Sequence, residues 1–167
     1  FKVNFICNWI YHFIRNFCCV PSLSRDGIPI GGIEGSLKSL QKIVREVNPT
    51  KIVLVWDGSG GSKRKKQIDK NYKEGRTPLR INNKNWSVNL SEKEQSENKI
   101  WQTKRLREYY EDMPVYQFVF DNVEADDVIS YINSLEEFED YQCVIVSADM
   151  DFIQLLNSKT ILYRPTQ

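Results

Sequence analysis

Residues 51–57 of this chain read KIVLVWD, an apolar run between a lysine and an aspartate. The run has strand length and β-branched residues, and it does not alternate with polar residues, which predicts a strand buried on both faces. Residues 115–120 (VYQFVF) and 143–146 (CVIV) predict similar strands, and residues 2–6 and 161–163 predict two shorter ones. The composition of these runs favours a parallel sheet.

Helical patterns separate the predicted strands. Apolar residues recur at helical spacing in residues 33–47, 92–112 and 123–139. Strand and helix alternate, which predicts an α/β fold with a mostly parallel central sheet and helices on both faces. A length of 167 residues fits one domain, so we expect a single domain over residues 1–167.

The composition excludes several classes of protein. With 41% apolar and 27% charged residues the chain can form a core, and no apolar run approaches a membrane span of about 20 residues. Residues 1–20 are apolar but interrupted by polar residues, so we do not expect a signal peptide. The four cysteines form no CxxC pair and His12 is the one histidine, which argues against a structural zinc site or a disulfide framework and favours a reducing cytoplasm.

Charge is distributed unevenly along the chain. Residues 1–120 hold 21 basic and 12 acidic residues, whereas residues 121–151 hold ten acidic residues and no basic one. A basic part next to an acidic part is typical of a polyanionic substrate and a metal site. Ordinary solvated surface is the alternative.

Six acidic residues directly follow three of the predicted strands. The carboxyl ends of parallel strands lie at one edge of the sheet, where open α/β folds bind ligands. We therefore expect these side chains to converge, and such a group needs a compensating cation, for which Mg²⁺ or Mn²⁺ suits oxygen ligands. The group can present carboxylates to two ions. Its members are Asp57, Glu124, Asp126, Asp127, Asp149 and Asp151.

Each of these acids also has a structural explanation. Glu124 and Asp127 are three residues apart and are expected to share a helix face, with Asp126 beside them, where they would also stabilise the helix dipole. Asp57 and Asp149 could be N-caps. The coincidence of three such groups, each after a predicted strand, favours the metal site.

A basic stretch begins directly after Asp57. Gly58, Gly60 and Gly61 allow a tight turn, and the lysines and arginines beyond them can neutralise backbone phosphates without reading sequence. Tyr72 within the stretch can stack on an unpaired base. A solvated loop is the alternative. The basic residues are Lys63, Arg64, Lys65, Lys66, Lys70, Lys73 and Arg76.

Several motifs together resemble the 5′→3′ exonuclease and flap endonuclease family. The segment VWDGSGGSKRKKQIDKNYKEGR resembles the family's strand-ending Asp followed by basic residues, NVEADDVISYI its EADD helix start, and VIVSADMDFIQLL its Asp-x-Asp and Gln-Leu helix. SRDGIPIGGIEGSLKSL resembles its linker into the second helix. That family includes phage ribonuclease H-type 5′ nucleases and the 5′-nuclease domain of bacterial DNA polymerases.

The resemblance implies a PIN-like fold and roles for particular residues. The six acids would bind metal directly or through water, Lys73 and Arg76 would contact the scissile phosphate, Arg64 would hold a nearby phosphate and Tyr72 would stack on the terminal base. It implies an Mg²⁺- or Mn²⁺-dependent enzyme, with two ions, that hydrolyses phosphodiester bonds near the 5′ end of DNA or RNA–DNA hybrids in replication or repair. Expected partners are a 5′ flap or a single-strand/duplex junction.

Two departures from the family pattern stand out. The family's first strand ends in a metal-binding Asp, and counting back without gaps from Asp26-Gly27 places Cys7 there, although a thiol is a poor Mg²⁺ ligand. Either that alignment is off, or the Asp is lost, or residues 1–20 are atypical. The family's C-terminal helical region is also expected to be missing.

Three functional hypotheses follow from the sequence. The first is a metal-dependent 5′ nuclease in a cytoplasm, that of the host if the gene comes from a phage. The second is a nucleic-acid-binding module that does not cleave. The third is a PIN-type endoribonuclease, which would prefer single-stranded RNA. The oligomeric state and the balance between exonuclease and endonuclease activity stay open.

Overall fold

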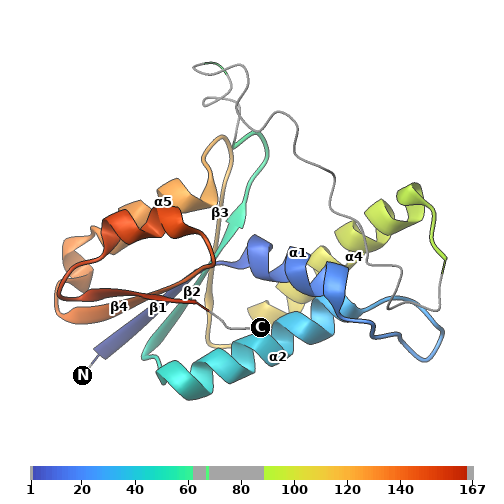
Figure 1. Ribbon diagram of the computed structural model, residues 1–167, viewed down its shortest axis with the longest axis horizontal. Helices are drawn as coiled ribbons and strands as arrows, with labels where there is room; N and C mark the ends of the chain where they lie inside the picture. The colour runs from blue at the N-terminus through green and yellow to red at the C-terminus, as the bar shows by residue number, and fades with distance from the viewer. Residues whose placement is uncertain (1, 62–66, 68–88, 165–167) are drawn as a thin grey trace. The chain divides into compact units, whose positions relative to one another are not determined.

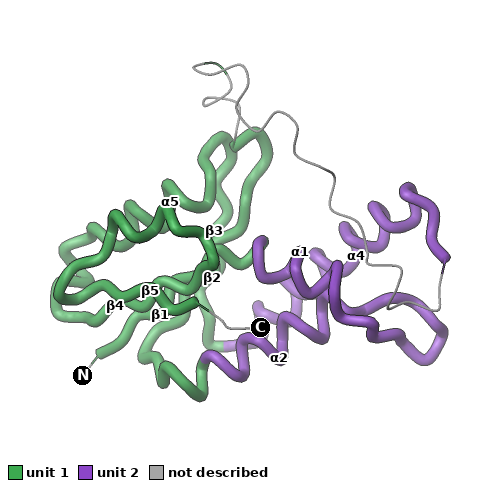
Figure 2. Tube along the Cα trace, in the orientation of Figure 1, with its two compact units in different colours: residues 1–10, 44–75, 114–167 green, residues 11–43, 76–113 purple. Residues whose placement is uncertain are grey.

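The computed structural model describes residues 2–61, 67 and 89–164, in two compact units. One unit comprises residues 1–10, 44–75 and 114–167 and contains the sheet; the other comprises residues 11–43 and 76–113 and contains helices (Figure 2). The chain therefore passes from the sheet unit to the helical unit and back twice.

The sheet has five strands, all parallel (Figure 1). They lie in the order β3-β2-β1-β4-β5, so β1 is central and the chain order reverses between β1 and β4. The predicted parallel α/β fold is confirmed, and a reversal point of this kind is where such sheets bind ligands. The strands are β1 (Lys2–Asn8), β2 (Lys51–Asp57), β3 (Tyr116–Phe120), β4 (Tyr141–Val146) and β5 (Thr160–Tyr163).

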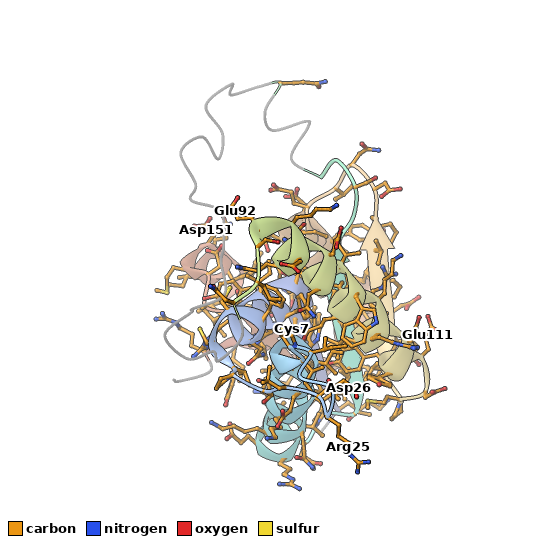
Figure 3. All side chains as sticks on the ribbon, turned by 90° about the vertical axis from the view of Figure 1, so that its right-hand side faces the viewer. Cys7, Arg25, Asp26, Glu92, Glu111 and Asp151 are labelled. Carbon is orange, nitrogen blue, oxygen red and sulfur yellow. The ribbon has the colours of Figure 1, made fainter. Side chains whose placement is uncertain are left out.

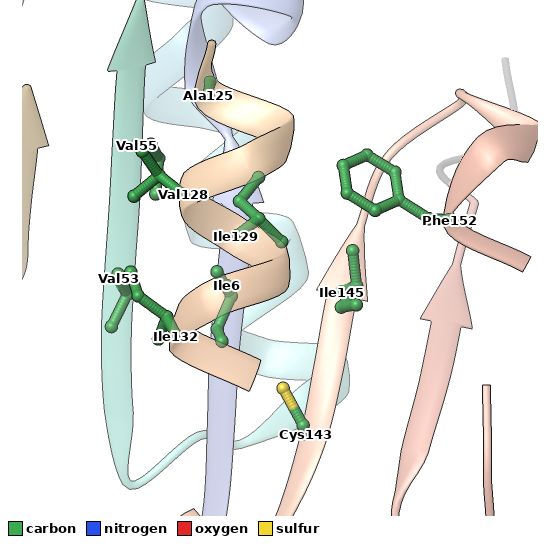
Figure 4. Packing of buried hydrophobic residues seen from close by; sticks show 10 residues of the cluster. All are labelled: Ile6, Val53, Val55, Ala125, Val128, Ile129, Ile132, Cys143, Ile145 and Phe152. Atoms are coloured by element: carbon green, nitrogen blue, oxygen red, sulfur yellow. The ribbon is translucent and has the colours of Figure 1, made fainter. Parts of the chain in front are cut away.

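Helix α5 (Ala125–Asn133) covers one face of the sheet (Figure 4). Its buried residues Ala125, Val128, Ile129 and Ile132 follow helical spacing, so they form one apolar stripe. This stripe packs on side chains that alternate along the three central strands, which fixes which residues of each strand face the helix. The strand residues in this core are Ile6, Val53, Val55, Cys143 and Ile145.

The expectation that residues 115–120 form a strand buried on both faces is wrong. β3 is an edge strand, and Tyr116, Phe118, Val119 and Phe120 are each at least 36% exposed. An apolar run gives the strand its propensity but carries no information on whether the strand lies at the edge of the sheet, where other elements cover its side chains less fully.

The helical pattern of residues 123–139 ends earlier than predicted. α5 stops at Asn133, because the backbone N–H groups of Ser134 and Leu135 turn back to the carbonyls of Tyr131 and Ile132. A short 3-10 helix, η2 (Glu136–Phe138), follows, and a second one, η3 (Met150–Leu155), follows β4.

The helical unit holds most of three helices. α2 (Gly31–Val47) and α4 (Glu92–Glu111) agree with the predicted ranges, whereas α1 (Trp9–Cys19) was not predicted. Ser91 and Glu94 form a capping box that starts α4. Among the described residues, none of the helices combines the length and the apolar character that a membrane span requires.

Within this unit His12 on α1 is 3% exposed. Burial, with a smaller contribution from the positive charge of Arg15, lowers the pKa of its imidazole from 6.5 to about 4. The folded chain therefore keeps this side chain neutral at a pH where the unfolded chain would take up a proton.

We expect the free energy of unfolding to fall on acidification. Below about pH 6.5 the imidazole of His12 binds a proton in the unfolded chain, whereas in the folded chain it stays neutral down to about pH 4. Between pH 7.5 and 5 this single group should account for a loss of roughly 2 kcal/mol. Urea unfolding at the two pH values measures it. A His12→Gln variant, which cannot titrate, should lose less stability over the same interval, and an equal loss would show that another group is responsible.

Candidate metal centre

The side chains at the carboxyl end of the central strands continue the stripe that faces α5. Asn8 lies two residues beyond Ile6 on β1, and Asp57 two residues beyond Val55 on β2. Since side chains two apart on a strand share a face, both point to the side of the sheet where α5 begins. Asp126 stands in the first turn of that helix.

Four carboxylates meet at this edge, with Asp126 at the centre of their interactions. Burial raises the pKa of Asp126, a hydrogen bond from Asn8 lowers it, and the negative charges of Asp149, Asp57 and Glu124 raise it further. The net direction is upward, and the contributions of the three neighbours show that each lies close enough to Asp126 to repel its charge. Glu124 is 5% exposed, and a buried carboxylate charge raises the free energy of the folded state unless a positive charge or hydrogen-bond donors compensate it.

Hydrogen bonds within the protein hold one oxygen of Asp126, of Asp57 and of Asp149. Asp126 accepts from Nδ2 of Asn8 at 2.8 Å, and Asp57 accepts from the backbone N–H of Ala125 at 3.1 Å. Asp149 accepts from the backbone N–H of Asp151 at 2.9 Å. Each carboxylate is therefore held in place through one oxygen, which preorganises it for a ligand at the other.

The loops that carry these acids are tied together. Ser59 donates from its backbone N–H and its hydroxyl to Asp121, each at 2.8 Å. Gly58, directly after Asp57, approaches β3 so closely that a Cβ there would lie 2.2 Å from the carbonyl oxygen of Phe120. Glycine is required at this position, and the contact fixes the end of β2 against the loop that leads to Glu124.

Two of the six predicted acids lie at the edge of this group. Asp127 is exposed, and its backbone N–H donates to the carbonyl of Glu124. Asp151 is exposed on η3 (Figure 3) and contacts Asp149 through its backbone. The expected shared helix face of Glu124 and Asp127 is wrong, because Glu124 is the N-cap residue with extended backbone, and Asp126 faces the other acids instead.

Cys7 does not stand at the metal position that ungapped counting gave it. It is fully buried among the strands (Figure 3), and its Sγ donates to the carbonyl of Val146 at 3.1 Å. Burial raises the pKa of this thiol well above its usual range. Asn8, the next residue, takes the position beside Asp126.

Sequence reasoning missed Asn8 because it ended the first strand at residue 6 and searched for charged residues. The period of two along the strand was the available signal. Ile6 faces the core, so residue 8 shares that face and lies at the carboxyl end.

The predicted basic and aromatic contacts to nucleic acid lie outside the described residues. They therefore stay predictions on the sequence alone. These residues are Lys63, Arg64, Lys65, Lys66, Lys70, Tyr72, Lys73 and Arg76.

The donor chemistry of the centre suits a hard divalent cation, since four carboxylates and an amide supply oxygen atoms. The Oδ1 of Asn8 is buried without a hydrogen-bond partner, as expected of a group that gains a contact when a ligand binds. However, within the described part of the chain no three His, Cys, Asp or Glu side chains are already arranged to hold a metal ion. The residues fit a cation in type, and their side chains would have to draw closer around it.

Comparison with known proteins places these features in a family. The sequence profile described as "5′-3′ exonuclease, N-terminal resolvase-like domain" matches residues 8–167. A 5′-3′ exonuclease of Aquifex aeolicus (strain VF5) is 26% identical over 156 residues, which cover 90% of this chain and 47% of the relative. Flap endonuclease Xni of Shewanella sp. (strain MR-4) is 32% identical over 114 residues, covering 68% of this chain and 37% of the relative.

Solved structures share the fold. The D15 protein of bacteriophage T5, co-crystallised with metal ions, superimposes with a TM-score of 0.70 at 17% identity over 98% of this chain and 55% of that one. A variant of the T5 flap endonuclease in complex with DNA and metal ions gives a TM-score of 0.65 at 18% identity over the same shares. The chain spans less than half the length of the two curated relatives above.

The mutual repulsion of the carboxylates predicts that Asp126→Asn stabilises the domain in EDTA. A raised pKa means that the ionised form of Asp126 is disfavoured in the folded state, and an amide removes that charge while keeping an oxygen to accept from Asn8. We expect the thermal midpoint at pH 7.5 to rise by a few degrees.

Asp127→Asn is the matched control, since it removes a neighbouring but exposed charge from the same helical turn. Its midpoint should stay level or fall slightly through the loss of a favourable dipole interaction. Equal rises in both variants would contradict a specific cluster around Asp126.

Proposed function

The chain belongs to the 5′-3′ exonuclease family through its N-terminal resolvase-like domain, and from this membership we propose that it is a metal-dependent 5′ nuclease with flap endonuclease activity. The single observation that carries the proposal is the gathering of Asp57, Glu124, Asp126 and Asp149 at the carboxyl edge of the parallel sheet. Phosphodiester hydrolysis needs such a group, because negative charge must be neutralised where a phosphate is attacked.

In this proposal the four carboxylates hold the cation and the hydrogen bonds described above orient them. Asn8 holds Asp126, the Ala125 backbone N–H holds Asp57, and the hydroxyl of Ser147 accepts from the Asp149 backbone N–H at 3.0 Å. A divalent cation, when bound, would neutralise phosphate charge and lower the pKa of a water molecule. Mg²⁺ is the proposed ion, with Mn²⁺ as a substitute and two ions as the proposed number.

Asp127 and Asp151 are proposed as outer ligands that act through water. Both are exposed and adjoin the four central carboxylates along the chain, so a hydrated ion can reach them. For the basic stretch we propose that Lys73 and Arg76 stabilise charge on the scissile phosphate and that Tyr72 stacks on a terminal base. Arg64 would hold a neighbouring phosphate. Lys63, Lys65, Lys66 and Lys70 would attract the backbone.

The proposed substrate is DNA at a 5′ flap or at a junction between single strand and duplex, with an RNA–DNA hybrid as a second substrate. The T5 flap endonuclease, a structural neighbour, was solved with DNA and metal ions, which supports DNA as the nucleic acid. We further propose that both units act as one nuclease domain in replication or repair. A cytoplasmic location is proposed from the cysteine pattern of the sequence.

A second candidate function is binding of nucleic acid without cleavage. It is favoured by the neutral Asn8 among the carboxylates and by the lack of a ready-made metal group in the described residues. Such a module would bind flap DNA with a steep salt dependence but would not turn it over.

A cleavage assay on a labelled 5′-flap substrate distinguishes the two functions. We expect Mg²⁺- or Mn²⁺-dependent cleavage that EDTA stops, with Asp149→Ala lowering the rate about a hundredfold or more through loss of a cation ligand. Asp140→Ala is the control, because this exposed acid lies at the opposite end of β4, just before its first residue.

Two results would decide against the nuclease. Equal cleavage by the wild-type chain and Asp149→Ala would mean that the activity comes from a contaminant. Salt-sensitive flap binding by the wild-type chain with no cleavage in either metal would favour the binding module.

A further inference from the structure

The contacts of Asn8 lead to an inference that rests on the proposed function and deepens it. Asn8 is the neutral side chain that faces Asp126 within a group of four carboxylates. Its Nδ2 donates to Oδ1 of Asp126 at 2.8 Å, and its own Oδ1 is buried without a hydrogen-bond partner. The amide nitrogen of Asn8 is therefore hydrogen-bonded to a carboxylate, whereas its amide oxygen is free to accept a further contact.

The position of Asn8 allows its amide to act on the group of carboxylates, which an amide elsewhere on the surface would not do. The residue ends the central strand β1, next to the point where the order of the strands reverses. β2 and β4, which carry the loops of Asp57 and Asp149, pair with β1 on either side. A side chain here lies between the two strands that lead to Asp57 and Asp149, and it bonds to Asp126 in the first turn of α5.

A carboxylate at this position would act in the opposite way. Two carboxylate oxygens at the distance now spanned by the hydrogen bond would repel each other, and the domain would hold five negative charges instead of four. With a divalent cation present, the fifth charge would instead strengthen binding. The choice of side chain at residue 8 therefore sets the balance between stability without a cation and affinity for one.

We propose that Asn8 is a positioning residue, which holds one oxygen of Asp126 and lets the domain keep its four carboxylates together when no cation is bound. Because the side chain of Asn8 is a neutral amide, the domain binds a divalent cation more weakly than it would with an aspartate at this position. Its buried Oδ1 is an oxygen of the type that hard cations accept, so it can contact the cation while Nδ2 keeps its hydrogen bond to Asp126.

Two variants of Asn8 test this in the intact chain, with two readouts that do not depend on cleavage. One readout is the thermal midpoint in EDTA, and the other is the affinity for Mn²⁺, measured from the electron paramagnetic resonance signal of the free ion. Asn8→Asp should lower the midpoint in EDTA by several degrees and tighten Mn²⁺ binding about tenfold. Asn8→Ala should weaken Mn²⁺ binding about tenfold, because Asp126 loses its anchor.

Gln41→Glu is the matched control, since it makes the same exchange of amide for carboxylate at an exposed position of α2. It should change neither readout. An Asn8→Asp chain that unfolds in EDTA and refolds with Mn²⁺ supports the proposal, and one that Mn²⁺ does not refold overturns it.

Other results also overturn the proposal. An Asn8→Asp chain with the wild-type midpoint in EDTA shows that Asn8 does not relieve repulsion, and this holds even if the wild-type chain binds no Mn²⁺. Wild-type Mn²⁺ affinity in Asn8→Ala shows that Asn8 does not position Asp126. Flap cleavage by the same preparations is scored separately, so that missing cleavage with both shifts present contradicts the nuclease and leaves the role of Asn8 intact.

Discussion

Repulsion between like charges is the constraint on which the arrangement of this domain depends. A parallel sheet brings the carboxyl ends of its strands to one edge. Here burial raises the pKa of Asp126, and the nearby negative charges of Asp149, Asp57 and Glu124 raise it further. The fold tolerates them because an internal donor holds one oxygen of Asp126, Asp57 and Asp149. The acids are thus kept in place by the rest of the protein rather than by one another.

The same donors explain why the centre is organised but open. Two of them are backbone N–H groups and cannot be changed by mutation without moving the chain, whereas the third belongs to the side chain of Asn8. A substitution at residue 8 therefore changes the charge of this edge without removing either backbone donor. The close approach of Gly58 to β3 fixes the end of β2, which carries Asp57.

Much of the fold could be predicted from the sequence because its information is local. The apolar run of β2, the spacing of Val128, Ile129 and Ile132 in α5, and the acids after each strand are visible in short windows. What could not be predicted depends on neighbours. The exposure of β3 follows from its place at the edge of the sheet. The role of Asn8 depends on β1 extending to residue 8 rather than ending at residue 6, and on the carboxylate of Asp126 on α5. A search for carboxylates finds the repelling groups and overlooks the neutral residue that anchors one of them.

The central place of β1 governs how this chain can fold as it is synthesised. β1 precedes both of its partners in the chain, and it pairs with β2 on one side and, across more than 130 residues, with β4 on the other, as in the register of Lys2 with Tyr141. Such long-range pairing makes folding slow, since a large loop must close before the contact forms. The nascent chain therefore keeps the edge of β1 that pairs with β4 open until β4 has been synthesised, and an unpaired strand edge of this kind is prone to aggregate.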